Sequence, residues 1–159
     1  LHGERRLFYP DGTVQIIEHY EHGRFEGLYQ AFYPNGQLEL EGRYVANEMT
    51  GEWKRYYDSG ELMEIVTFAH NAENGPFREF YKNGRLKTEG TYRGGDFEHG
   101  ELKKYDENGT LVQRMQCLEG ICQTVWTLEE GELPFDEEAF RAKVTRLKTI
   151  ERLEAAARR

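Results

Sequence analysis

Short segments in which apolar and polar residues alternate return along this chain at a nearly constant interval. Each segment follows a turn-forming pair, made of Asp, Asn or Ser and then glycine. The glycines of these pairs are 24, 24, 24 and 25 residues apart: Gly12, Gly36, Gly60, Gly84 and Gly109. A fixed period of this size predicts a repeat array, in which each unit buries its apolar face against its neighbours.

The segment after each glycine has the pattern of a strand with one apolar face. Successive side chains of a strand point to opposite faces, so positions an even number of residues apart share a face. Two columns obey this rule: Val14, Leu38, Leu62, Leu86 and Leu111, and then Tyr20, Tyr44, Phe68, Tyr92 and Cys117. Gly42 and Gly90 lie between these columns and leave room for a ring from the adjacent strand. The pattern predicts a one-sided antiparallel sheet.

Turn chemistry predicts β-hairpins. Asn-Gly and Asp-Gly pairs favour two-residue turns, because both central residues of such turns have positive φ. Looser turns are expected at residues 21–26, 46–50, 69–74 and 93–99. The last of these holds the extra residue of the 25-residue interval, which predicts a bulge or a longer loop there. Residues 1–7 are expected to be the frayed end of a first strand.

The period changes after residue 133. Apolar residues then recur at steps of three and four, as on one stripe of an amphipathic helix: Phe140, Val144, Leu147, Ile150 and Leu153. Asp136 is the expected N-cap, and Phe135 with Phe140 forms the expected hydrophobic staple. The chain therefore divides into an array at residues 1–133, with about five units and a degenerate last one, and a helix at residues 134–159. This helix either covers part of the array or projects to pair with a partner helix or with itself.

The predicted fold class is mostly β, an elongated single-layer antiparallel sheet of β-hairpin repeats with a C-terminal α-helix. The segment Tyr20-x-x-Gly23-x-x-x-Gly27 resembles a MORN repeat, and the Asn-Gly-x-Leu half resembles the bacterial variant of that repeat. The resemblance covers about residues 8 to 116; Asn47 and Asn71 replace the first glycine, and Leu102 replaces the aromatic residue. It implies a binding or scaffolding role. Variant-repeat proteins carry antitoxin labels, and repeats of the first type are linked to phospholipids and membrane junctions.

Charge narrows the choice of partner. The net charge is −8, but residues 134–159 contain seven Lys or Arg and five Asp or Glu, so the first 133 residues carry −10. An acidic array repels phosphate backbones and anionic headgroups. We therefore expect no nucleic-acid partner and no membrane contact through the repeats. A protein partner, and a basic one in particular, is favoured.

Aromatic residues supply the candidate binding face. They occupy two columns of one strand face: Tyr29, Trp53 and Phe77, and then Tyr33, Tyr57 and Tyr81. The opposite face of the same strand also carries rings, at Phe32, Tyr56 and Phe80. These rings either pack the sheet against the C-terminal helix or a neighbouring hairpin, or one set of them forms an exposed patch for a partner. Tyrosine and tryptophan are enriched in protein interfaces.

The sequence gives little support for a catalytic site or a metal site. No nucleophile elbow, phosphate loop or zinc-protease motif is present, and a single-layer sheet offers no enclosed cleft for paired carboxylates. His22 and His70 share a repeat column but lie roughly 19 Å apart at ordinary strand spacing, too far to share one ion. No enzyme activity, cofactor or metal is expected. Cys117 and Cys122 form a disulfide in an oxidising compartment or remain two half-buried thiols.

These observations favour a non-catalytic protein-binding repeat module, with a neutralising binder of antitoxin or immunity type as the specific hypothesis. Two alternatives remain open: a structural scaffold at an envelope or membrane, and carbohydrate binding by stacking on the aromatic face. Self-association through the C-terminal helix also remains open. So does the compartment, which is either the cytoplasm or the envelope of a bacterium.

Overall fold

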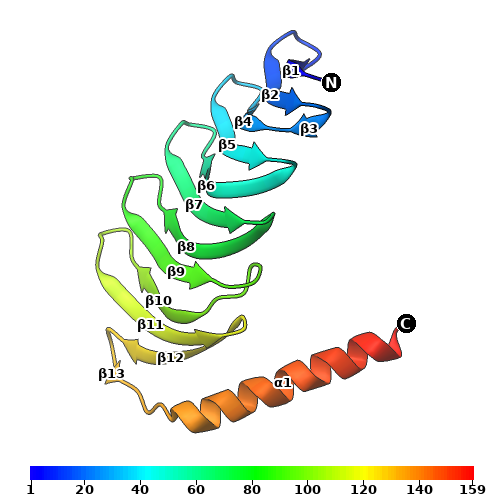
Figure 1. The fold of residues 1–159 in the computed structure, drawn as a ribbon. Helices are drawn as coiled ribbons and strands as arrows, with labels where there is room; N and C mark the ends of the chain where they lie inside the picture. The colour runs from blue at the N-terminus through cyan, green and yellow to red at the C-terminus, as the bar shows by residue number, and fades with distance from the viewer.

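Thirteen strands of the computed structural model, which describes all residues from 1 to 159, form one antiparallel sheet (Figure 1). Consecutive strands are hydrogen-bonded neighbours, apart from β3, which pairs with β2 beside the main path. The strands are β1 (Gly3–Phe8), β2 (Val14–Glu21), β3 (Arg24–Phe25), β4 (Gly27–Phe32), β5 (Leu38–Val45), β6 (Glu48–Tyr56), β7 (Leu62–Ala69), β8 (Ala72–Phe80), β9 (Leu86–Tyr92), β10 (Gly100–Tyr105), β11 (Leu111–Leu118), β12 (Ile121–Thr127) and β13 (Gly131–Glu132). The predicted fold class is confirmed.

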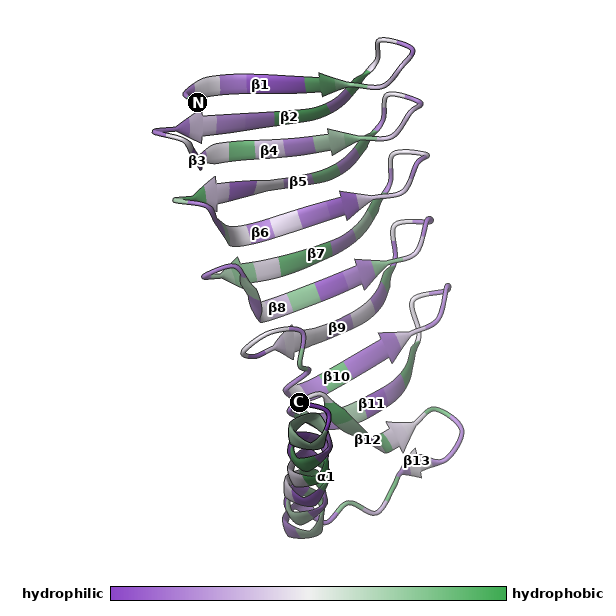
Figure 2. Cartoon of the chain, turned by 90° about the vertical axis from the view of Figure 1, so that its right-hand side faces the viewer, coloured by the Kyte–Doolittle hydropathy of each residue, from purple (hydrophilic) through white to green (hydrophobic).

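The hairpins are stacked in sequence order, with β1 at one end and helix α1 (Glu137–Ala157) at the other (Figure 1). Figure 2 shows the same stack after a quarter turn, with α1 beyond β12 at the end of the sheet. Only 11 of the 159 residues are buried, because a single-layer sheet has no second layer to cover a whole face. Most of the sheet is therefore in reach of a partner.

The first strand is more ordered than its sequence predicts. β1 pairs with β2 along its whole length, from Gly3 opposite Tyr20 to Phe8 opposite Val14. Arg5 reaches across to form an ion pair with Glu18, whose side chain is buried. The prediction of a frayed end at residues 1–7 is wrong, because backbone pairing and this ion pair hold the strand.

The turns after the aromatic pairs are not two-residue turns, so that prediction is wrong. In the first of them Gly12 N donates to Tyr9 O and Tyr9 N donates to Thr13 O, at 2.9 and 2.8 Å. Only the glycine has positive φ, whereas the preceding residue does not. This is a three-residue loop with a glycine bulge, and the same bonds recur at Tyr33, Tyr57, Tyr81 and Asp106. Asn35 is suited to this loop because its Oδ1 accepts from Gln37 N at 2.9 Å.

The tight two-residue turns lie at the opposite ends of the strands, and the first three of them fall where looser turns were predicted. Both central residues have positive φ in the turns at His22-Gly23, Ala46-Asn47, His70-Asn71 and Glu119-Gly120. Asn47 tolerates this conformation and also joins two repeats, because its Oδ1 accepts from Phe25 N at 2.7 Å. The segment 93–99 is a longer loop, as its extra residue predicts.

Packing on the apolar face depends on the small residues that the sequence places there. A Cβ on Gly90 would lie 2.6 Å from Leu102 Cδ1 and 2.9 Å from Phe77 Cε1. Phe77 and Leu102 are buried with Cys117 in one cluster, against which Val66 and Tyr92 pack. The prediction that glycines make room for large side chains of adjacent strands is confirmed.

Tyrosine hydroxyl groups connect each repeat to the next. Each donates to a backbone carbonyl oxygen of the following unit at 2.6–2.7 Å. The pairs are Tyr9 to Phe32, Tyr33 to Tyr56, Tyr57 to Phe80 and Tyr81 to Tyr105. In the last unit Asp106 replaces the tyrosine, and its carboxylate accepts from Asn108 N and Thr110 N within its own turn. This tyrosine ladder therefore ends where the array ends.

Helix α1 confirms the predicted C-terminal helix and its N-terminal signals. Asp136 is the N-cap and accepts from Ala139 N at 3.0 Å, and the rings of Phe135 and Phe140 lie 5.4 Å apart. Phe140 and Val144 are buried. From Thr149 onward every residue is exposed, including Leu153 at 66%. The apolar stripe thus divides into a docked half and a projecting half. The helix lacks the length of apolar sequence that crossing a bilayer requires.

Candidate functional site

A row of aromatic rings crosses the apolar face over successive repeats. The Tyr20 and Phe25 centroids are 4.7 Å apart, those of Phe25 and Tyr44 are 4.8 Å apart, and those of Tyr44 and Trp53 are 5.2 Å apart. Phe68 and the stacked pair Phe77–Tyr92 continue the row. We call this surface the aromatic face; its rings are Tyr20, Phe25, Tyr29, Tyr44, Trp53, Phe68, Phe77 and Tyr92. Apart from Trp53 and Phe77, these rings are half-buried.

The six aromatic residues selected from the sequence have two different environments. Tyr29, Trp53 and Phe77 belong to the aromatic face, where Trp53 and Phe77 are 3% and 4% exposed and form its core. The other three are the half-buried tyrosines of the ladder, Tyr33, Tyr57 and Tyr81. Sequence reasoning placed Tyr20, Tyr44, Phe68 and Tyr92 in one apolar column but did not assign them to the site. Tyr20, Tyr44 and Phe68 each precede a ring of the other column by nine residues, and this constant interval is the signal that could have found them.

A hollow of about 260 Å³ opens on the aromatic face beside Trp53. Its apolar lining comes from β5 to β9 and consists of Leu40, Met49, Trp53, Val66, Phe68 and Tyr92. Its charged lining is Arg55, Glu64, Glu73 and Asp96. Arg55 Nε lies 3.5 Å from Glu64 Oε1, whereas Glu73 and Asp96 form no ion pair. The hollow therefore combines aromatic rings with two unpaired carboxylates.

Two polar groups beside this hollow have perturbed environments. The Nε1 atom of Trp53 is buried and has no hydrogen-bond partner, which is costly for an N–H donor. Burial, followed by the charges of Glu98, Glu79, Glu64 and Asp96, raises the pKa of the Tyr92 hydroxyl to about 12. Both burial and negative charge disfavour the phenolate. The hydroxyl group of Tyr92 therefore lies in poorly hydrated surroundings with a negative electrostatic potential.

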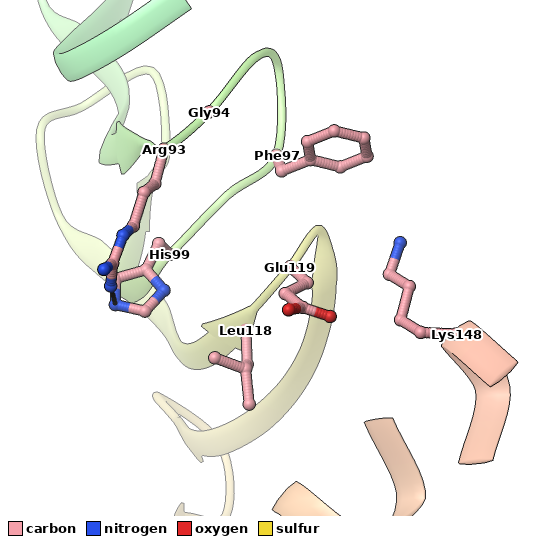
Figure 3. Close-up of a pocket in the computed structure, with 7 residues that line it drawn as sticks. All are labelled: Arg93, Gly94, Phe97, His99, Leu118, Glu119 and Lys148. Carbon is pink, nitrogen blue, oxygen red and sulfur yellow. Dashed lines mark hydrogen bonds between the residues drawn. The ribbon is translucent and has the colours of Figure 1, made fainter. Parts of the chain in front are cut away.

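A larger hollow, of about 520 Å³, lies where α1 meets the array (Figure 3). Lys148 extends from the helix toward Phe97 of the 93–99 loop, with its Nζ 4.8 Å from the ring centroid. The basic groups of this hollow already have partners, since Arg93 Nη1 lies 3.3 Å from His99 Nε2 and Lys148 Nζ lies 3.2 Å from Glu151 Oε2. The hollow marks the place where the helix docks on the array.

The two cysteines face each other directly in the β11–β12 pair, and their Sγ atoms form a disulfide. Cys117, Val125 and Phe140 line one further hollow, so the disulfide lies at the junction between the array and the helix. No three His, Cys, Asp or Glu side chains come together as metal ligands.

The family is decided by five matched segments. The family model described as MORN repeat variant matches residues 1–22, 25–46, 49–70, 73–93 and 98–116, more than half of the chain. The chain belongs to the MORN repeat variant family. Each matched segment is one hairpin with a glycine-bulge loop at its centre, and the first three boundaries fall at the two-residue turns. MORN membership indicates a repeat-based binding or scaffold module, and the family is generally non-catalytic. No curated protein matches the chain.

Proposed function

We propose that this MORN repeat protein is a non-catalytic module that binds a basic protein on its aromatic face. The observation that carries the proposal is an aromatic face that no other part of the chain covers. Helix α1 lies at the last hairpins (Figure 1). The row of rings from Tyr20 to Tyr92 extends over the repeats before them. Half-buried aromatic rings on a rigid sheet are typical anchors of protein interfaces.

Charge defines the chemistry of the partner. The array carries −10, and two carboxylates at the hollow on its aromatic face, Glu73 and Asp96, form no ion pair within the chain. Complementary charge accelerates association and discriminates against acidic proteins. A basic surface that fits the aromatic face buries the rings and neutralises these carboxylates in one step.

Within this function, neutralisation of a basic toxin is the specific role that we propose. An antitoxin or immunity protein acts by covering the functional surface of its target, which needs an extended and rigid binding face. A five-repeat sheet of the MORN variant type provides such a face, and its acidic charge suits a basic target.

The experiment is capture of partners from host extract by the tagged protein and two double variants. Tyr29→Ala with Tyr44→Ala removes two half-buried rings from the aromatic face. Ile17→Ala with Leu28→Ala is the matched control, because these half-buried residues belong to the opposite face of strands β2 and β4. We expect the wild type and the control to retain one basic protein that the Tyr29/Tyr44 variant loses. Equal retention by all three proteins, or an acidic partner, contradicts the proposal.

A scaffold role is the second candidate, and the projecting half of α1 favours it. Ile150 and Leu153 are 43% and 66% exposed although they continue the buried stripe of Phe140 and Val144. If these residues join two copies, the wild type elutes at twice the mass of a Leu153→Glu variant. Elution of both proteins at the monomer mass excludes self-association through this stripe.

A further inference from the structure

We propose that the hollow beside Trp53 and Tyr92 receives a single lysine or arginine side chain of the protein partner. This inference rests on the proposed function and specifies its anchor. It assigns a role to the one irregular segment of the array, the 93–99 loop.

The loop with the extra residue builds one wall of the hollow. It folds back on β8, where Gly95 N donates to Glu73 O at 2.9 Å and Gly94 N donates to Asn74 Oδ1 at 3.2 Å. Asp96 then lines the same hollow as Glu73. The equivalent turns of the preceding repeats have only two central residues, such as His70-Asn71, and carry no acidic side chain there. The pair of unpaired carboxylates is thus specific to this place in the array.

The charge in the hollow is unbalanced. Arg55 and Glu64 neutralise each other at 3.5 Å, which leaves Glu73 and Asp96 without a counter-charge. The raised pKa of Tyr92 has burial as its main cause, and Asp96 and Glu64 contribute to it. An incoming cation is attracted by these carboxylates, and the low hydration of the nearby rings strengthens this attraction by lowering the local dielectric constant.

The apolar lining selects the kind of cation. Lysine and arginine side chains carry a long apolar stem, which packs on aliphatic and aromatic groups while the charged end meets carboxylates. Met49, Phe68 and Tyr92 offer such a lining, and aromatic rings also attract a cation placed over their faces. A hydrated metal ion gains nothing from these groups, and no set of three ligands exists for it.

The test uses two peptides, acetyl-Gly-Gly-Arg-Gly-Gly-amide and the same peptide with citrulline, the neutral isostere of arginine. Binding is followed through Trp53 fluorescence in a Trp126→Phe background, since these are the only two tryptophans. We expect saturable binding of the arginine peptide, with at least tenfold weaker binding of the citrulline peptide. Glu73→Gln with Asp96→Asn removes this preference. The control variant, Glu52→Gln with Glu107→Gln, removes the same amount of charge at two exposed carboxylates elsewhere. We expect this control to keep the preference for the arginine peptide.

Equal binding of the two peptides, or an unchanged preference in the Glu73/Asp96 variant, overturns the inference. Capture from extract with the same variants separates this failure from failure of the proposed function. The Glu73/Asp96 variant retaining the basic partner while the Tyr29/Tyr44 variant loses it would leave the proposed binding function intact. The same result would refute the role of the hollow as the site of a basic side chain. If the arginine peptide binds as expected but the wild type retains no protein, the hollow does bind a basic side chain and the proposed function fails.

Discussion

Gly42 lies directly beneath the indole ring of Trp53, so closely that a Cβ at this position would be 2.0 Å from Cδ2 of the ring. Gly42 and Tyr29 are paired across β4 and β5, and Trp53 comes from β6, so three adjacent strands meet at this contact. The aromatic face depends on it, because Trp53 is the most buried aromatic residue of the row.

The first prediction concerns this contact. Gly42→Ala should lower the free energy of unfolding by about 2–3 kcal/mol, because the added methyl group must displace a packed ring. Chemical denaturation measures the change. Arg43→Ala is the control, since this neighbouring side chain is exposed and should have little effect. A Gly42→Ala variant as stable as the wild type would show that the ring moves at no cost.

The second prediction concerns the tyrosine ladder. Tyr57→Phe removes the hydrogen bond from the hydroxyl to Phe80 O at 2.7 Å, and should lower the free energy of unfolding by about 1 kcal/mol. Tyr56→Phe is a matched control, because Tyr56 is the adjacent half-buried tyrosine and its hydroxyl makes no hydrogen bond. The account of the ladder is contradicted if both substitutions have the same effect on the denaturation midpoint.

The third prediction concerns alkaline pH. Burial raises the pKa of Tyr92 to about 12; burial and a hydrogen bond to Glu89 raise that of Tyr105 to about 12. Because both values exceed the unfolded value of 10.0, the neutral forms stabilise the folded protein below pH 10, and this stabilisation is lost as pH rises from 10 to about 12. Stability measured across this range should fall less steeply in a Tyr92→Phe, Tyr105→Phe variant. Parallel curves for the two proteins would contradict the assignment.

The fourth prediction concerns the docked half of α1. Phe140→Ala removes a buried anchor, so the helix should detach and its amide protons should exchange faster along its length, while those of β4–β9 stay protected. Leu153→Ala is the control on the same stripe, and its exposed side chain should leave exchange unchanged. Unaltered protection of α1 in the Phe140→Ala variant means that other contacts hold the helix.

Much of the fold follows from periodicity alone. The repeat interval, the apolar columns and the space at Gly42 and Gly90 all result from residue spacing, which also gives the N-cap at Asp136. The position of the two-residue turns could not be predicted from residue spacing. Asn-Gly is compatible with a two-residue turn and with a glycine-bulge loop, and the choice depends on the register of the flanking strands, where bulges recur.

The candidate site was predictable only in part. Sequence columns identified Tyr29, Trp53 and Phe77 as rings on one face, but not that Trp53 and Phe77 are buried by neighbouring strands. The hollow beside Trp53 depends on side chains from five strands and on a loop that folds back to bring Asp96 beside Glu73. No local sequence pattern predicts that Asp96 lies beside Glu73, because this arrangement depends on the length and the backbone hydrogen bonds of that loop.

The central claim is that the aromatic face binds a basic protein. The most direct measurement is the affinity of the captured partner for the wild type, the Tyr29/Tyr44 variant and the Ile17/Leu28 control. We expect the Tyr29/Tyr44 variant to bind at least about a hundredfold more weakly, because two interface anchors are lost, and the control to bind as the wild type does. Equal affinities for all three proteins, or a loss confined to the Ile17/Leu28 control, would place the binding surface elsewhere.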